Sequence, residues 1–98
     1  MKRIIEKGSF ADNDSAYILF QDRGKYFLEL FGFPAKVDKL CDFKSYLDEN
    51  LGVTAVAIHD GRSFVGLDDD SLFDTLARNE KSILFEVKLD FDISSYGL

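Results

Sequence analysis

Segment 82–93, S-I-L-F-E-V-K-L-D-F-D-I, alternates between apolar and charged residues. Six large apolar residues share one parity of this segment: Ile83, Phe85, Val87, Leu89, Phe91 and Ile93. The other parity holds Glu86, Lys88, Asp90 and Asp92, with Leu84 as its only apolar residue. Because successive side chains of a strand point to opposite faces, this pattern predicts a long β-strand with one face in a core. Such a strand needs a sheet to join and a helix or second sheet to cover it. The pattern leaves open whether the strand lies at an exposed edge or between neighbours.

Further strands are indicated by short runs rich in aromatic and β-branched residues. The predicted runs are 16–20, 26–31, 53–58 and 63–66, with a short peripheral strand at 3–6 and a polar connector up to residue 15. The first two runs flank the turn 21–25, in which Gly24 can adopt a positive φ, so they are expected to form a β-hairpin.

The segment 35–51 has helical spacing instead. One helical face is formed by Val37, Leu40, Cys41, Lys44, Leu47 and Leu51. Gly52 follows where a helix C-cap is expected. On this face Cys41 is expected to be a small buried hydrophobic residue and not a nucleophile. A short second helix is predicted at about 70–77, with aspartates at its N-terminus.

These elements predict one α+β domain spanning 1–98, in which 1–15 form a peripheral strand and connector. The expected architecture is a curled, mixed or antiparallel sheet of four to six strands packed on one main helix, with a β-grasp-like topology. A single cysteine cannot form an internal disulfide, and no apolar run reaches the ~20 residues of a membrane span. The N-terminus lacks the apolar stretch of a secretion signal. A cytoplasmic location without membrane contact is therefore expected.

The net charge of −6 is unevenly distributed. Residues 1–49 hold nine acidic and eight basic residues, whereas residues 50–98 hold nine acidic and four basic residues. Binding to nucleic acid depends on lysine and arginine, so direct binding to nucleic acid is not expected. An acidic surface suits a basic protein partner. The alternative explanation is that the charge only keeps a small domain soluble.

No motif with recognisable chemistry is present. His59 lies beside Asp60 in an H-D-G-R turn, where an exposed, non-catalytic imidazole is expected. The run Asp68–Asp70 lacks the alternating spacing of a calcium loop, which favours helix capping and a solvated acidic patch over a metal site. No catalytic, cofactor-binding or metal-binding residue is predicted, and the chain is not expected to be an enzyme.

Residues 52–85 contain V-T-A-V, D-G, an acidic run, F-D-T-L and N-E-K-S-I. This pattern resembles the CIDE-N domain, the ubiquitin-like domain shared by caspase-activated DNase and its inhibitor. With K-L-C-D at 39–42 and the basic residues Arg23 and Lys25 of the first hairpin, the resemblance extends over about residues 16–87. It implies a ubiquitin-like fold and head-to-tail pairing between a basic and an acidic face, which in that family restrains a nuclease. The family's acidic E-D-G turn is His59-Asp60-Gly61 in this chain.

The function expected from these observations is a non-enzymatic acidic domain that masks a basic protein partner, such as an inhibitor or immunity protein acting on a nuclease or toxin. The expected contact residues are Asp60, Asp68, Asp69, Asp70 and Asp74, joined by exposed Glu86, Asp90 and Asp92. One alternative is self-association, with Arg23 and Lys25 of one copy on the acidic helix of the next. A small enzyme or metal-binding protein is the other alternative.

Overall fold

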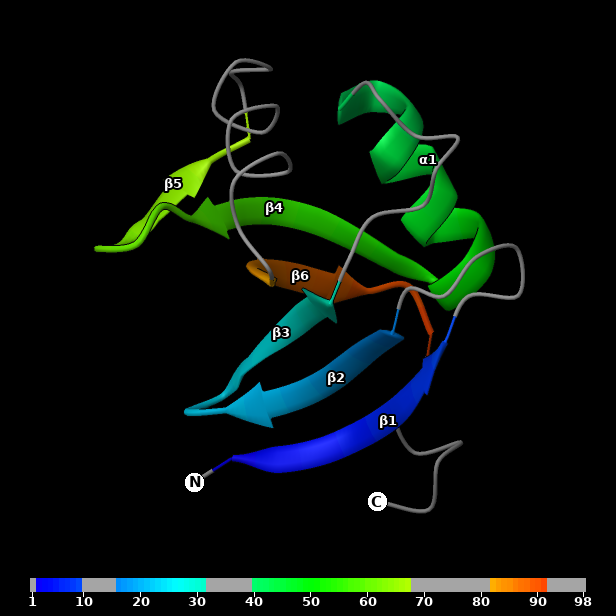
Figure 1. Ribbon diagram of the computed structural model, residues 1–98. Helices are drawn as coiled ribbons and strands as arrows, with labels where there is room; N and C mark the ends of the chain where they lie inside the picture. Colours follow the sequence, from blue (N-terminus) through cyan, green and yellow to red (C-terminus); the bar gives the residue numbers. More distant parts are fainter. Residues whose placement is uncertain (1, 10–15, 32–39, 68–81, 92–98) are drawn as a thin grey trace.

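The strand predicted at 82–93 is β6 (Ile83–Leu89), and it lies inside the sheet, between β3 and β4. The computed structural model describes residues 2–9, 16–31, 40–67 and 82–91 (Figure 1). In chain order the other elements are β1 (Arg3–Ser9), β2 (Ala16–Asp22), β3 (Lys25–Phe31), α1 (Leu40–Leu51), β4 (Val53–His59) and β5 (Phe64–Gly66). The prediction of an α+β fold is confirmed.

The six strands form one sheet in the order β1-β2-β3-β6-β4-β5, and every pair is antiparallel. Strands β1 and β5 are the two edges, and α1 lies over one face (Figure 1). The expectation of a curled sheet was wrong. The sheet is open, because β1 extends it beyond the single helix instead of closing around that helix. A β-grasp sheet is mixed, and no parallel pair occurs among the described strands, so that detail is not confirmed.

The β2–β3 hairpin turns through two residues, both with a positive φ: Arg23 at 54° and Gly24 at 79°. A two-residue turn of this kind has a backbone twist that matches the twist of the flanking strands. It aligns β2 and β3 without a break, from Asp22↔Lys25 to Ala16↔Phe31. The predicted hairpin is therefore confirmed, with strands slightly longer than expected.

Helix α1 ends at Gly52, as predicted. Gly52 has a φ of 67° and donates its N–H to the carbonyl of Asp48 at 3.0 Å. The inward face was only partly predicted: Phe43 and Leu47 are fully buried, whereas Lys44 is half-buried. The two buried residues are four apart and so lie one above the other on the helix. The predicted face omitted Phe43, although its aromatic ring buries more apolar surface than the neighbouring lysine can.

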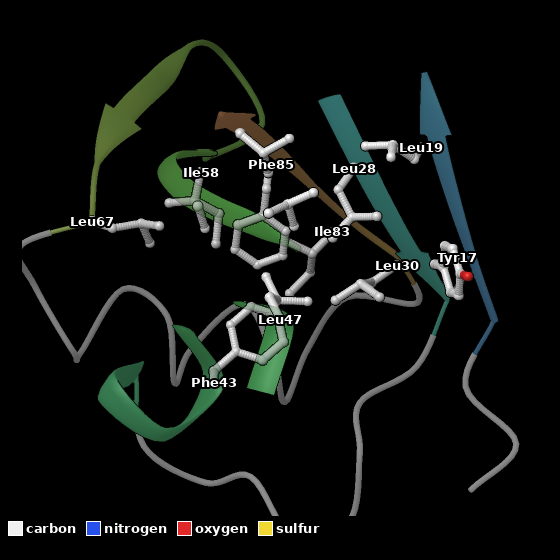
Figure 2. Packing of buried hydrophobic residues seen from close by; sticks show 13 residues of the cluster. Tyr17, Leu19, Leu28, Leu30, Phe43, Leu47, Ile58, Leu67, Ile83 and Phe85 are labelled. Carbon is white, nitrogen blue, oxygen red and sulfur yellow. The ribbon is translucent and has the colours of Figure 1, made fainter. Parts of the chain in front are cut away.

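The core lies between α1 and one face of the sheet (Figure 2). Phe43 and Leu47 point from the helix toward the strands, and the ring of Phe43 lies 5.1 Å from that of Phe85 on β6. Ile83, Phe85 and Val87 of β6 are all buried, which confirms the predicted inward parity. Each large side chain buried in this way contributes roughly 1.5–3 kcal/mol before the entropic cost of ordering it.

Gly8 lies where β1 closely approaches a side chain of β2. A Cβ placed on Gly8 would lie 2.8 Å from the hydroxyl oxygen of Tyr17. Tyr17 is buried and lies directly across the strand pair from Gly8.

Several predictions lie outside the described residues: the helix at 70–77, the beginning of the main helix at 35–39, the connector up to residue 15, and Ile93.

Candidate functional site

The sheet face opposite α1 carries a line of aromatic rings that the sequence analysis did not identify. The rings of Phe20 and Phe27 lie 5.4 Å apart, and Phe64 continues the line 5.3 Å from Phe27. The ring of His59 meets Phe64 edge-on at 5.0 Å. Phe20 and Phe27 pair directly across the hairpin, so the turn length could have revealed their contact. Phe64 lies three strands away from Phe27 in the sheet, and no local sequence signal links the two.

A shallow groove of about 320 Å³ lies against these rings. The ammonium of Lys2 sits over the ring of Phe20, 4.3 Å from its centre. The groove also reaches Asp22 and Leu84. Phe27 is half-buried, whereas Leu28 and Leu30 on the opposite face of the same strand are buried, and Phe64 is half-buried as well.

Asp60 organises the turn between β4 and β5. Its Oδ1 accepts hydrogen bonds from the N–H groups of Arg62, at 2.8 Å, and Ser63, at 2.9 Å. These two bonds, the one from Ser63 first, lower the pKa of the Asp60 carboxyl below its ordinary value. The carboxylate is therefore ionised and held in a fixed place at an exposed corner of the sheet. A partner-binding role for Asp60 must coexist with this structural role.

His59 was expected to be exposed, and the structure corrects this. The imidazole is half-buried, packs against Phe64, and accepts a hydrogen bond at Nδ1 from the N–H of Gly61 at 3.1 Å. The residue thus has a structural role in the same turn.

The basic residues predicted for partner binding lie at the tip of the β2–β3 hairpin. Arg23 is in the turn, and Lys25 is 65% exposed, with its ammonium 3.9 Å from the carboxylate of Glu86. Glu86 was expected to be exposed, but only 26% of its side chain is accessible, because it lies inside the sheet and pairs with Lys25. A salt bridge this long and this open to solvent contributes little to stability.

The strand register places this basic tip and the Asp60 turn at opposite ends of strands β3 and β4. Tyr26, Val87 and Ala55 share one row across β3, β6 and β4, close to the hairpin. Strand β4 then runs away from that row and ends at His59. Arg23 and Lys25 therefore lie at one end of the strands, and Asp60 lies at the other.

A second acidic cluster lies where α1 ends. The carboxyl of Asp48 lies close enough to that of Asp90 to donate a hydrogen bond to it when protonated, and this bond, partial desolvation and the repulsion by Asp90 and Glu49 raise the pKa of Asp48 above its ordinary value. Asp90 also accepts a hydrogen bond from the hydroxyl of Thr54 at 3.0 Å. The last turn of α1 contains no basic residue, so the helix dipole disfavours the charge of Asp48 as well.

The remaining predicted contact residues, Asp68, Asp69, Asp70, Asp74 and Asp92, lie outside the described residues. The residue before the first of them is fixed: Leu67 is buried in the core, and its carbonyl accepts a hydrogen bond from Lys44 Nζ at 3.4 Å.

Within the described ranges, no group of three or more histidine, cysteine, aspartate or glutamate residues is arranged to hold a metal ion. The same part of the chain contains no helix with the length and apolar character needed to cross a bilayer. Comparisons with protein families, characterised proteins and solved structures find no match to this chain.

Proposed function

We propose that this chain is a non-enzymatic binding domain that masks a basic protein partner with an acidic surface, in the manner of an inhibitor or immunity protein of a nuclease or toxin. The observation that carries the proposal is the uneven distribution of the net negative charge along the chain. The described residues hold eight basic and nine acidic residues, so they are almost neutral. Most of the net charge of −6 therefore belongs to the segments between and after them.

The most acidic of these segments begins directly after Leu67. Asp68, Asp69 and Asp70 are consecutive, and Asp74 follows within the same segment. Leu67, the residue that precedes them in the chain, is buried in the core. Asp60 adds a carboxylate that is ionised and fixed by its turn. A concentrated acidic surface on a nearly neutral framework steers a basic partner to one region.

The test compares two variants of equal net charge. In the first, Asp68, Asp69 and Asp70 are all replaced by Asn. In the second, the acidic cluster at the end of α1 is neutralised by Asp48→Asn, Glu49→Gln and Asp90→Asn. Each variant and the unchanged protein are used to capture partners from cells that express the protein, at low salt. The captured partner is then assayed for nuclease or toxin activity with and without the protein.

We expect a basic partner that is inhibited by the unchanged protein and by the second variant, but is bound weakly or not at all by the first. Equal binding to both variants would mean that only total charge matters, or that the aspartates are not involved. A captured partner whose activity the protein does not alter would contradict the inhibitor role.

A second candidate function is head-to-tail self-association. The observation that favours it is the placement of Arg23 and Lys25 at one end of the strands and of Asp60 at the other. Surfaces of opposite charge on opposite ends can pair copy to copy, and such pairing forms open chains unless it closes into a ring. Sedimentation at low salt tests this candidate: growth with concentration that Lys25→Glu abolishes supports it, and a monomer at every concentration excludes it.

A further inference from the structure

A groove of about 570 Å³ lies where the β2–β3 hairpin separates from β6. Pairing between β3 and β6 ends at Tyr26↔Val87, whereas β6 continues to Leu89, which pairs with Val53 of β4 on the other side. At the hairpin tip, the position that a Cβ on Gly24 would occupy has no atom within 4 Å. The groove is therefore open space beside the last residues of β6, which pair with β4 but not with β3.

The backbone of Leu89 points into this space. Alternate residues of an antiparallel strand direct their N–H and C=O groups to alternate sides. The N–H of Asp90 donates to the carbonyl of Gly52, at 2.8 Å, and so points toward β4. The N–H and C=O of Leu89 consequently point the other way, toward the hairpin. Beyond Tyr26↔Val87, no described strand pairs with β6 on that side.

The two sides of the groove differ in chemistry. Lys25 and Lys88 both line the groove, and the β3–β6 register, extended by one step past its last pair, brings these two positions opposite each other. Like charges placed directly across from each other are unfavourable. Glu86 approaches Lys25 at 3.9 Å and is the groove's acidic residue. Tyr26, Leu89 and Phe91 supply the apolar side.

An extended peptide matches all three features. Its main chain can hydrogen-bond to that of Leu89, on the side of β6 where the pairing with β3 has ended. Since its side chains alternate between faces, a carboxylate can reach Lys25 and Lys88 while the next residue packs against Tyr26, Leu89 and Phe91. The carboxylate also relieves the repulsion between the two lysines. We propose that this groove binds an extended segment of a partner protein in which acidic and apolar residues alternate. The residues that line the groove are different from the aspartates of the proposed function, and they select a partner segment of opposite charge.

The test uses a fluorescein-labelled hexapeptide of alternating glutamate and leucine residues, with blocked termini, and a matched peptide in which glutamine replaces glutamate. Fluorescence anisotropy at low salt measures the affinity of each peptide for the full chain. We expect the glutamate peptide to bind, and the glutamine peptide to bind at least about fivefold more weakly, the factor that corresponds to the upper range for an exposed charge pair.

Two lysine variants locate the site. Lys88→Gln should weaken the binding of the glutamate peptide by about fivefold. Lys88→Glu should weaken it further, by more than replacing glutamate with glutamine in the peptide does. Lys7→Glu on β1 is the matched control, because Lys7 is also exposed on a strand but does not line the groove. Circular dichroism checks that all three variants are folded. Amide NMR spectra should show the largest peptide-induced shifts at Leu89 and Gly24.

Three results would overturn the proposal: no binding of the glutamate peptide, equal loss of affinity in Lys88→Glu and Lys7→Glu, or amide shifts centred on Phe20 and Phe64 instead of Leu89. Because none of these measurements involves the segment after Leu67, they do not depend on the proposed function, and either proposal can fail alone.

Discussion

Replacing Phe43 tests which face of α1 points into the core. Phe43 is fully buried, and its ring lies 5.1 Å from that of Phe85. Removing a buried phenylalanine side chain as far as Cβ typically costs about 3–5 kcal/mol, and an aromatic pair accounts for about 0.5–1.5 kcal/mol of such an effect. A domain of this size has about 5–15 kcal/mol of stability in total. Phe43→Ala is therefore expected to remove a large share of the stability of the domain, and all of it if the total is at the low end of this range.

Phe43→Leu is the more informative variant because it keeps most of the apolar volume. Its expected cost is about 1 kcal/mol, within the range for size-conserving core replacements. With a urea dependence of about 1–3 kcal/mol per M, the unfolding midpoint should fall by about 0.3–1 M. Equilibrium urea unfolding followed by circular dichroism measures this shift.

Lys44 provides the opposing measurement. The sequence pattern placed Lys44 on the inward face, whereas in the structure it is half-buried and reaches the carbonyl of Leu67. Lys44→Leu is therefore expected to leave the unfolding free energy nearly unchanged or to lower it. If Phe43→Leu has no effect and Lys44→Leu stabilises the domain, the helix is rotated from the orientation described, and the reasoning is refuted.

Three further predictions follow from single contacts. Gly8→Ala should lower the free energy of unfolding more in the native protein than in a Tyr17→Phe background, because the nearest atom to the new Cβ is the tyrosine hydroxyl oxygen. We expect a coupling of about 0.5–3 kcal/mol from urea unfolding of the four variants, and equal effects in both backgrounds would contradict this contact. Asp48 has a raised pKa in the folded state, so its contribution to stability declines as pH rises through that pKa. Asp48→Asn should remove this decline and raise the thermal midpoint at neutral pH, and an unchanged dependence of the midpoint on pH would exclude the contact with Asp90. Asp60 has a lowered pKa in the folded state, so its stabilising effect is present above its ordinary pKa and is lost as pH falls through the folded value. Asp60→Ala should therefore lower the thermal midpoint at neutral pH but not at strongly acidic pH. The same difference in midpoint between the variant and the unchanged protein at all pH values would show that the charge of Asp60 is not involved.

The strands were predictable because their signals are local. The alternation around Phe85 identifies the inward face of β6, and Gly24 marks the hairpin turn that fixes the pairing of β2 with β3. The helix was harder. Its 3.6-residue period allowed two neighbouring faces, and the choice between Phe43 and Lys44 depends on which side chain the sheet can accept.

The candidate binding surfaces were only partly predictable. Lys25 could be assigned to an exposed basic turn from its position beside Gly24. The groove could not be foreseen, because it brings Lys88 of β6 together with Lys25 of the hairpin where the ladder between β3 and β6 has ended. That relation depends on strand order, which local sequence patterns do not encode. The structural role of Asp60 was likewise missed, although an aspartate before Gly61 in a short turn is a recognised signal for bonds to the following N–H groups.

The interior position of β6 also determines how the chain can fold. The first three strands can form an antiparallel meander early, and β4 can pair with β5 as soon as both exist, but these two parts do not pair with each other. Both keep a bare edge, on β3 and on β4, until the latest of the six strands in chain order arrives between them. Since pairing between distant segments must be formed before the core can close, folding should be slow for a chain of this length. During synthesis, the two bare edges are the surfaces most exposed to aggregation.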